Sequence, residues 1–326
     1  MPILLSETDV RQLVAMDDLI ETMARTLAAF SAGAVSQPVR SVVEIAPRRA
    51  FFAAMPAFVA DPPALGAKLV TVYPRNQTLD LPSHLATIVL LDPDTGELLA
   101  LMDGRYLTEA RTAAVSAVSA RLLAAPGPAV LAILGSGVQA RSHLDALGRV
   151  RELREIRVWS PRPESRKRFA REMIHRAPAT IHSAASAEEA VRGANLIALV
   201  SAATEPILRS DWVEDGAHVC AVGACRPTHR EMDGALVARA RLLVDSREGA
   251  LIEAGDIVLA IREGRVGPDH VAGEIGEAIA GRVRGRTAPD QVTVFKSLGM
   301  AVEDVAAADL AYRRACERGL GRGVAL

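Results

Sequence analysis

Residues 129–147 read AVLAILGSGVQARSHLDAL, and this stretch decides the fold of the second half of the chain. Its first six residues form an uninterrupted apolar run, which is typical of a buried parallel strand. A G-x-G-x-x-A pattern follows directly, made by Gly135, Gly137 and Ala140 at the start of a helical segment. The first glycine would allow a tight turn, the second a close backbone approach to a pyrophosphate, and the alanine close helix packing. In isolation this pattern is often only a loop, but between a strand and a helix it predicts a dinucleotide site.

The alternation of strand and helix continues beyond this stretch. Apolar runs lie at residues 156–159, 195–200, 218–222 and 241–245, with polar helical segments between them. Such alternation indicates a parallel sheet that is covered by helices on both faces. We therefore expect a Rossmann-type doubly wound parallel sheet, a dinucleotide-binding domain of residues 126–299.

The first part of the chain follows a different pattern. Ser6 is placed to cap a short helix, and a second helix is expected at about residues 17–33. Strand-like segments separated by turns follow at residues 39–46, 50–56, 66–73, 86–91 and 98–102. They predict a mostly antiparallel sheet. A helix is expected from Thr108, as its N-cap, to the Pro126-Gly127-Pro128 turn, and a last helix from about residue 303 to 318. The whole is an α/β chain with an α+β domain of residues 1–125 and 300–326.

Composition narrows the possible classes of function. A chain of 326 residues is long enough for two domains with a cleft between them. A formal charge of −1 provides no strong positive field for nucleic acid, which favours a small-molecule substrate. No membrane-spanning stretch or secretory signal is recognisable, so a cytoplasmic protein is expected. Three scattered cysteines, and histidines without ligand spacing, predict neither disulfides nor a metal site.

The second strand of the dinucleotide domain ends in Ser160-Pro161-Arg162. At this place an NAD-binding protein usually carries Asp or Glu, which bonds a ribose hydroxyl. Ser160 and Arg162, with Arg166 and Lys167 nearby, are better suited to a 2′-phosphate. The sequence therefore favours NADPH as cofactor, with NADH as the second choice. The alternative interpretation of these basic residues is a solvated helix face.

Five motifs, in this order along the chain, resemble those of one known family. They are PSHLATIVLLDPDTGELLALMDGRYLTEARTAAVSA at residues 82–117, LGSGVQA at 134–140, ATEPIL at 203–208, AVGACRPTHREMD at 221–233 and TVFKSLGMAVEDVAAADLAY at 293–312. Together they resemble the ornithine cyclodeaminase/μ-crystallin family over nearly the whole chain, and within it the ketimine reductase branch. The resemblance implies a homodimer in which the first domain binds the substrate and makes the dimer interface.

The resemblance also implies roles for single residues. Arg111, in the RTAA motif, would hold an anion. We place it in the first turn of a helix, where a cation opposes the helix dipole, and such an unfavourable position often indicates a functional residue. The alternative is an ordinary surface arginine. Lys68 lies in an apolar strand, where a charge is costly unless it faces a site or reaches water. Lys68 and Arg40 match residues that hold the substrate carboxylate and the reacting centre. Lys68 and Arg111 are the expected catalytic residues. Ser83 and His84 match residues beside an imine ring, although a lone histidine in a turn is more often structural.

The positions that match the family's dinucleotide-binding residues lie in the RTAA motif, in the glycine turn and at strand ends. They are Arg111, Gly135, Ser136, Gly137, Val138, Gln139, Ser160, Arg162, Ser201, Val222, Gly223, Ala224 and Ser297. The further expected substrate contacts are Cys225, His229 and Leu298.

The loop at residues 221–233 departs from the cyclodeaminase branch. Cyclodeaminases carry an aspartate two residues after the glycine that matches Gly223, and this chain has Cys225 there. Cyclodeamination of ornithine needs repeated proton transfers by a group of suitable pKa, whereas reduction of a preformed imine needs mainly orientation. Glu231 and Asp233 follow at spacings that suit the start of the next helix. We expect Cys225 to act as a small apolar residue rather than as a nucleophile.

The resemblance thus implies an NAD(P)H-dependent reductase of cyclic ketimines in proline metabolism. It would convert Δ1-pyrroline-2-carboxylate or Δ1-piperideine-2-carboxylate to L-proline or L-pipecolate. Three alternatives are an ornithine cyclodeaminase-type lyase with bound NAD, an amino-acid dehydrogenase of the alanine dehydrogenase kind, and a ligand-binding protein with little catalysis. Cys225 argues against the first of these, and Lys68 with Arg111 against the last.

Overall fold

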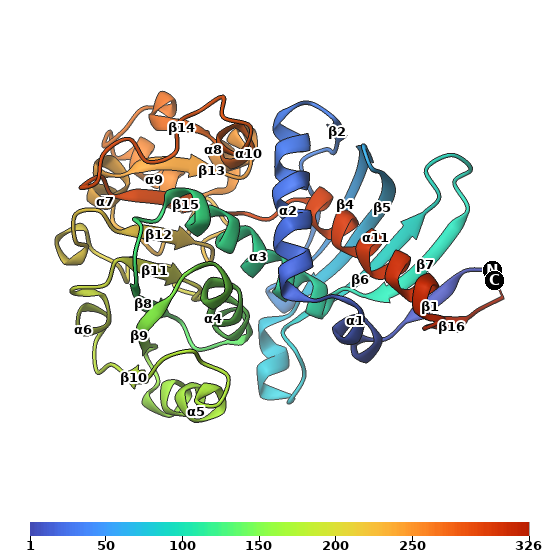
Figure 1. The fold of residues 1–326 in the computed structure, drawn as a ribbon, viewed down its shortest axis with the longest axis horizontal. Coiled ribbons are helices and arrows are strands. Elements are labelled where there is room, and N and C mark those ends of the chain that lie inside the picture. The colour runs from blue at the N-terminus through green and yellow to red at the C-terminus, as the bar shows by residue number, and fades with distance from the viewer. Residues whose placement is uncertain (326) are drawn as a thin grey trace. The chain divides into compact units, whose positions relative to one another are not determined.

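The computed structural model describes residues 1–325, which form two compact units (Figure 1). Unit 1 comprises Met1–Arg111 and Gly299–Leu326, and unit 2 comprises Thr112–Leu298. The division falls within helix α3 (Arg105–Leu123). The chain thus leaves unit 1 along a helix and returns to it after the last strand of unit 2.

Unit 2 is built on a parallel sheet of eight strands among the described residues. In spatial order they are β10 (Ile181–Ser183), β9 (Leu153–Trp159), β8 (Ala129–Leu134), β11 (Leu196–Leu199), β12 (His218–Ala221), β15 (Thr293–Lys296), β13 (Arg241–Val244) and β14 (Val271–Glu274). In strand β8, Val130 and Leu134 belong to one apolar cluster, and Leu131 and Ile133 belong to another. Since both faces of the strand are buried, the expected doubly wound sheet is confirmed.

The helices of unit 2 follow the strands in the expected alternation. They are α4 (Val138–Val150), α5 (Pro163–Met173), α6 (Ala187–Val191), α7 (Gly234–Arg239), α8 (Arg247–Glu253), α9 (Gly255–Arg262) and α10 (Ile275–Ile279), with short 3-10 turns at Ser210–Trp212 and Pro268–His270. The predicted apolar runs became β9, β11, β12 and β13. Strands β10 and β14 were not expected, because neither contains a continuous apolar run.

Unit 1 contains the mostly antiparallel sheet that the sequence predicts. In spatial order its strands are β16 (Arg322–Gly323), β1 (Ile3–Leu5), β7 (Leu98–Asp103), β6 (His84–Leu91), β5 (Pro63–Val72), β4 (Ala50–Ala60) and β2 (Val35–Ser36), and β3 (Ser41–Ile45) also pairs with β4. Within this sheet, the β1–β7 pair is parallel and the other pairs of described strands are antiparallel. The register of β5 on its neighbours places Lys68 on one face of the sheet and Leu69 on the other.

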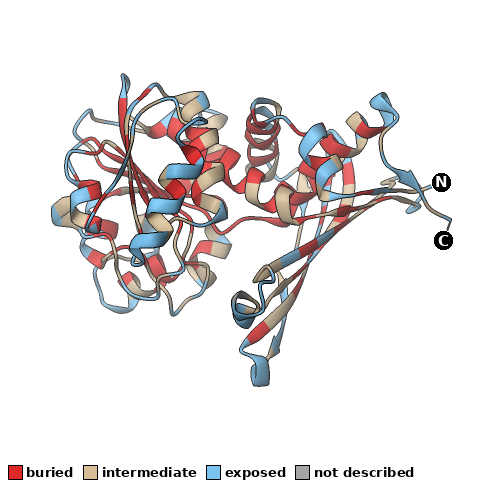
Figure 2. Ribbon diagram, turned by 90° about the horizontal axis from the view of Figure 1, so that it is seen from below, coloured by how far each residue is buried: buried red, intermediate tan, exposed pale blue. Residues whose placement is uncertain are grey.

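Helices cover one face of this sheet (Figure 2). They are α1 (Glu7–Leu13), α2 (Met16–Ser31) and α11 (Ala301–Arg318), and the short 3-10 turns lie at Ala46–Arg48 and Pro74–Thr78. Helix α11 packs on α2 and on strands β4 to β7. Ser6 caps α1 as predicted, with Asp9 closing a capping box. The opposite face exposes Phe58, Leu69 and Leu85.

Helix α3 begins earlier than predicted, and Thr108 is not its N-cap. The helix starts at Arg105, whose amide donates to Oδ1 of Asp103 over 2.9 Å. The hydroxyl of Thr108 instead donates to the carbonyl of Gly104, one turn back along the helix. Arg111 is therefore the seventh residue of α3, and the expectation of a cation in the first turn is wrong. In residues 1–325 no helix has the length and apolar character needed to span a membrane.

Candidate functional site

Two buried cations of unit 1 share a pair of adjacent carboxylates. Lys68 extends from the helix-covered face of β5, and its Nζ lies 2.5 Å from Oδ2 of Asp304. Arg111, on α3, donates from Nε to Oδ1 of Asp304 over 2.9 Å and from Nη1 to Oε2 of Glu303 over 2.5 Å. Both acids lie in the first turn of α11 and are fully buried. These four side chains form one buried ion cluster. Together with Arg40, which is described below, we call them the cation cluster.

Glu303 and Asp304 were not expected as site residues. Acidic residues in the first turn of a helix complement its dipole, so their presence needed no further explanation. Their adjacency was the available signal: neighbouring helical residues point about 100° apart, and both are flanked by the apolar Val302 and Val305. Two adjacent acids on the buried side of an apolar helix require cationic partners.

The electrostatics of the cluster follow from its burial. Burial lowers the pKa of Lys68 to about 8; Asp304 opposes this shift, and Arg111 and Arg40 add to it. Burial would raise the pKa of Asp304, but Arg111 and Lys68 outweigh this effect and hold it below its usual value. Burial, with the nearby charge of Lys68, lowers the pKa of His84 to about 4, so its imidazole is neutral near pH 7. The cluster therefore combines an ionised carboxylate, a lysine that titrates near neutrality and a neutral imidazole.

Arg40 joins the cluster at Gly299, two residues before the start of α11. Its Nη2 donates to the carbonyl of Gly299 over 3.2 Å. Gly299 has a φ of +78°, and a Cβ there would lie only 2.8 Å from Nη2 of Arg111, so neither backbone nor space admits a side chain. Ser83 lies directly before His84, the first residue of β6. The structure thus brings Arg40 and Arg111 to one place in unit 1.

The glycine turn of unit 2 has the geometry that a dinucleotide needs. Gly135 has a φ of +133°, and a Cβ there would lie 2.5 Å from the carbonyl oxygen of Val200. The Cβ position of Gly137, the N-cap of α4, is open within 4 Å, so a ligand can approach its backbone. Val138 and Gln139 begin α4. A pyrophosphate therefore fits this turn, both in shape and in the charge of the helix N-terminus.

The end of β9 carries hydroxyl and basic groups where a carboxylate is usual. The Oγ of Ser136, in the glycine turn, donates to Oγ of Ser160 over 3.0 Å. Arg166 reaches back from α5 and donates to the carbonyl of Ser160 over 2.8 Å. Arg162, the N-cap of α5, is exposed, and Lys167 lies 3.6 Å from Glu164. The exposed side chain of Arg162 is therefore placed where a ligand at this strand end could contact it.

A buried acid joins the ends of β11 and β12. Ser201 donates from its amide and its hydroxyl to Oε1 of Glu231, over 2.8 and 2.7 Å. The amide of Gly223 donates to Oε2 over 2.7 Å. Burial raises the pKa of Glu231 to about 7, although Lys296 lowers it. The interpretation of Glu231 as a helix-start residue is therefore wrong; Asp233 alone has that place, capping α7 through the amide of Leu236.

The remaining predicted residues of unit 2 lie in the segments that follow β12 and β15. Val222 and Ala224 flank Gly223, and the Sγ of Cys225 donates to the carbonyl of Val222 over 3.3 Å while packing against an apolar cluster. Cys225 Sγ also lies 3.9 Å from the carbonyl of Leu298. The amide of Leu298 and the hydroxyl of Ser297 both donate to Asp245. The amide of His229 closes a turn onto the carbonyl of Arg226.

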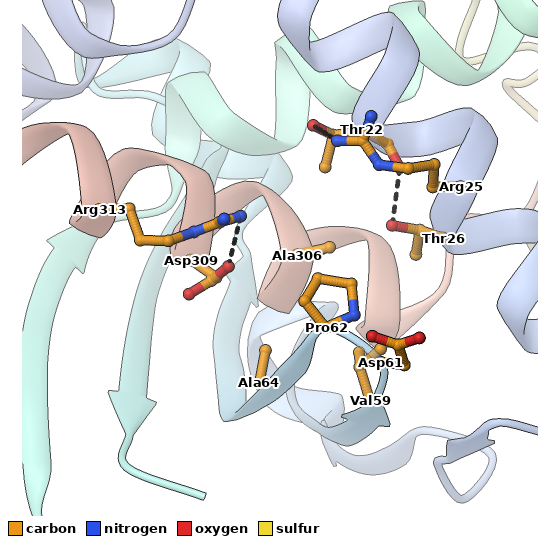
Figure 3. A pocket seen from close by; sticks show the side chains of 10 residues that line it. All are labelled: Thr22, Arg25, Thr26, Val59, Asp61, Pro62, Ala64, Ala306, Asp309 and Arg313. Atoms are coloured by element: carbon orange, nitrogen blue, oxygen red, sulfur yellow. Dashed lines mark hydrogen bonds and ion pairs between the residues drawn. The ribbon is translucent and has the colours of Figure 1, made fainter.

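A pocket elsewhere in unit 1 does not belong to the predicted site (Figure 3). It lies between α2, α11 and the β4–β5 turn, and it is lined by Thr22, Arg25, Thr26, Val59, Asp61, Pro62, Ala64, Ala306, Asp309 and Arg313. Arg313 pairs with Asp309 at 2.8 Å, and the hydroxyl of Thr26 donates to the carbonyl of Thr22. Its described lining includes none of the residues predicted from the sequence. Among residues 1–325, no group of three or more His, Cys, Asp or Glu side chains is arranged to hold a metal ion.

The glycine turn after the first strand of a doubly wound sheet, and a second unit with a buried cation cluster, define a two-unit Rossmann-type α/β protein. The profile of the ornithine cyclodeaminase/mu-crystallin family matches residues 1–319, so the chain belongs to this family. The family resemblance stated from the motifs is thereby confirmed.

Relatives at high identity carry reductase names. The chain is 45% identical to ketimine reductase mu-crystallin of Mus musculus, covering 95% of this chain and 96% of the relative. It is 35% identical to a Δ1-pyrroline-2-carboxylate reductase of Bacillus cereus, over 99% of both chains. A solved structure of Thermococcus litoralis Δ1-pyrroline-2-carboxylate reductase, in complex with NADH and L-proline, superposes with a TM-score of 0.97 at 37% identity, covering 99% of this chain and 100% of the other.

Proposed function

We propose that this chain is an NAD(P)H-dependent ketimine reductase that converts Δ1-pyrroline-2-carboxylate, Δ1-piperideine-2-carboxylate or both to L-proline and L-pipecolate. The observation that carries the proposal is the cation cluster of unit 1. In it Lys68 and Arg111 pair with two adjacent acids, Glu303 and Asp304. Arg40 lies close enough for its charge to lower the pKa of Lys68. Several cationic groups gathered in one place suit a substrate that carries a carboxylate.

The cluster also suits the chemistry of imine reduction. Adding a hydride to the C=N carbon and a proton to the nitrogen yields a secondary amine. A bound reduced nicotinamide supplies the hydride. Arg40 and Arg111 fix the carboxylate, which orients the planar C=N group beside it. Lys68, with a pKa of about 8, holds a proton at Nζ near neutral pH and hydrogen-bonds the imine region. His84 is neutral there and can contact the ring without adding charge.

Unit 2 supports the choice of cofactor. Gly135, Gly137 and the first turn of α4 would hold the pyrophosphate, and Ser201 and Gly223 would lie along the nicotinamide half. Arg162, beside the hydroxyl of Ser160, would bond a 2′-phosphate. We therefore propose NADPH as the preferred cofactor, with NADH as the weaker one.

An ornithine cyclodeaminase-type lyase is the less favoured function for the same fold. A cyclodeaminase needs a group of suitable pKa to move protons at the substrate nitrogen. Cys225 occupies that loop position, and its thiol donates to a backbone carbonyl and packs on the apolar core. Glu231 is committed to backbone amides and a hydroxyl of unit 2.

The experiment is to incubate the purified protein with either imine and NADPH or NADH, and to follow the near-ultraviolet absorbance of the reduced cofactor. We expect oxidation of the cofactor and formation of L-proline or L-pipecolate. No absorbance change with either imine and either cofactor would refute the assignment. Ammonia release from ornithine would favour the lyase, and a rate with pyruvate that depends on ammonium would favour the dehydrogenase.

We also propose a homodimer through the open face of the sheet in unit 1. Phe58, Leu69 and Leu85 lie on the face opposite to the helices and are exposed. An exposed sheet face that carries several large apolar side chains suits an interface between subunits. Light scattering of the parent and of Leu69→Lys tests this: we expect a dimer that dissociates in the variant, and a monomeric parent would refute the proposal.

A further inference from the structure

Glu231 is an unusual carboxylate, because it is fully buried and accepts hydrogen bonds from residues at two strand ends. It accepts from Ser201, which lies just after β11, and from Gly223, which lies just after β12. The two partners use different oxygens: Ser201 donates to Oε1 and Gly223 to Oε2. A Cβ on Gly223 would lie 2.6 Å from Oε1, so only glycine permits this approach. One side chain thus ties together the carboxyl ends of two neighbouring parallel strands.

A second buried pair holds Glu231 itself in place. Oδ1 of Asp256, at the start of α9, accepts from the amides of Glu231 and Met232 over 2.8 and 3.0 Å. Oδ2 of Asp256 lies 3.1 Å from Nζ of Lys296, the last residue of β15. Asp256 and Lys296 are fully buried. The support therefore runs from β15 through α9 to the ends of β11 and β12.

The strand order says which part of a dinucleotide these ends would meet. In a doubly wound sheet the dinucleotide binds across the point where the strand order reverses, with one mononucleotide half on each side. In this sheet the order reverses at β8, with β9 and β10 on one side and β11 and β12 on the other. The residue after β9 is the one that faces the adenosine ribose. The ends of β11 and β12 therefore belong to the nicotinamide half.

We propose that Glu231 is a positioning residue for the nicotinamide half of the cofactor, acting through Ser201 and Gly223. The inference rests on the proposed cofactor binding of unit 2. Glu231 touches neither substrate nor reacting atoms in this scheme. Its carboxylate fixes the spacing of the two strand ends, so that the backbone that faces the nicotinamide is already in place before binding.

The test is Glu231→Gln, which keeps the shape and replaces one oxygen by an amide donor. Because both oxygens accept from backbone amides, the new NH2 must point at an N–H donor of either Ser201 or Gly223. We expect the affinity for NADPH and NADH to fall by about ten- to a hundredfold, which is the usual effect of one unsatisfied buried donor. The affinity for ADP-ribose and its 2′-phosphate, which lack the nicotinamide, should stay within about twofold of the parent. Glu263→Gln serves as control, because Glu263 is exposed and pairs with Arg230 beside the same segment.

Two outcomes would overturn the inference. One is an unchanged NADPH and NADH affinity in Glu231→Gln, and the other is an equal loss for the dinucleotides and for ADP-ribose, which indicates a general distortion of unit 2. If Glu231→Gln does not fold, Glu231→Asp replaces it, because aspartate keeps both carboxylate oxygens but has a side chain shorter by one methylene. We again expect weaker binding of NADPH and NADH with unchanged binding of ADP-ribose. Dinucleotide affinities equal to those of the parent would overturn the inference. Failure of the proposed function shows differently, as a parent protein that binds NADH or NADPH and reduces neither imine.

Discussion

Gly299→Ala is the change that tests most directly whether the position of Arg111 governs the activity. A Cβ at this glycine would lie 2.8 Å from Nη2 and 3.0 Å from Cζ of Arg111, whereas ordinary contact begins at 3.4 Å. The guanidinium is held between Glu303 and Asp304 at 2.5 and 2.9 Å, so its retreat must weaken at least one of these bonds. The control is Gly33→Ala, since Gly33 has the same φ of +78° in unit 1 and its Cβ position has no neighbour within 4 Å.

The difference between the two variants isolates the contact with Arg111. Each alanine should cost about 1–2 kcal/mol for its left-handed backbone. Breaking a buried ion pair costs about 3–5 kcal/mol, and a weakened one costs less, so Gly299→Ala should lose roughly 2 kcal/mol more than Gly33→Ala. A displacement of about 1 Å in a binding group lowers the rate by about a hundredfold. We therefore expect kcat/KM for the imine to fall about a hundredfold in Gly299→Ala and to remain near the parent value in Gly33→Ala.

The measurements are urea unfolding and steady-state reduction of Δ1-pyrroline-2-carboxylate, with NADPH affinity as a check on unit 2. NADPH affinity should stay at the parent value in Gly33→Ala, whose Cβ position has no neighbour within 4 Å, whereas a loss in Gly299→Ala would show that Arg111 also contacts the cofactor. If Gly299→Ala and Gly33→Ala show equal kcat/KM and equal loss of stability, the reasoning about Arg111 is refuted.

Three further predictions follow from single residues. The pKa of buried Lys68 is about 8, below its usual 10.5, so the unfolded chain binds more protons than the folded chain between these pH values. The free energy of unfolding of the parent, relative to that of Lys68→Met, should therefore rise as pH increases from 8 to 10.5, as measured by urea titration. A difference that does not change with pH would contradict this prediction. Arg162→Ala should weaken NADPH binding by about tenfold and leave NADH binding unchanged, as measured by cofactor fluorescence; equal effects on both would remove the 2′-phosphate role. Asp233→Ala removes the N-cap of α7 and should lower the free energy of unfolding by about 1–2 kcal/mol without changing NADPH affinity, whereas unchanged stability would show that the cap contributes nothing.

The framework of unit 2 could be predicted because its signals are local. The run Ala129–Leu134 is apolar at every position, and only a strand buried on both faces explains such a run before a glycine turn. The start of α3 could not be predicted in the same way. Threonine is a common N-cap residue, but here the carboxylate of Asp103 accepts from the amide of Arg105 and the helix starts there. The hydroxyl of Thr108 then lies within the helix and donates to the carbonyl of Gly104. Asp103 and Thr108 could each have capped the start of α3, and the choice between them depends on the surrounding fold rather than on the local sequence.

The roles of the acids in the cation cluster and of Glu231 were missed for a common physical reason. Glu303 and Asp304 begin α11, and Glu231 precedes α7, and at such positions the helix dipole already favours a carboxylate. When the local sequence already explains why a carboxylate is present, nothing in the sequence indicates that it also makes a long-range contact. The cationic partners were easier to find, because Lys68 within an apolar strand has no local explanation. Since a buried cation requires an anion, the prediction of Lys68 as a site residue already implied a buried acid elsewhere in the chain. An adjacent pair of acids inside an apolar helix was the place to look for it.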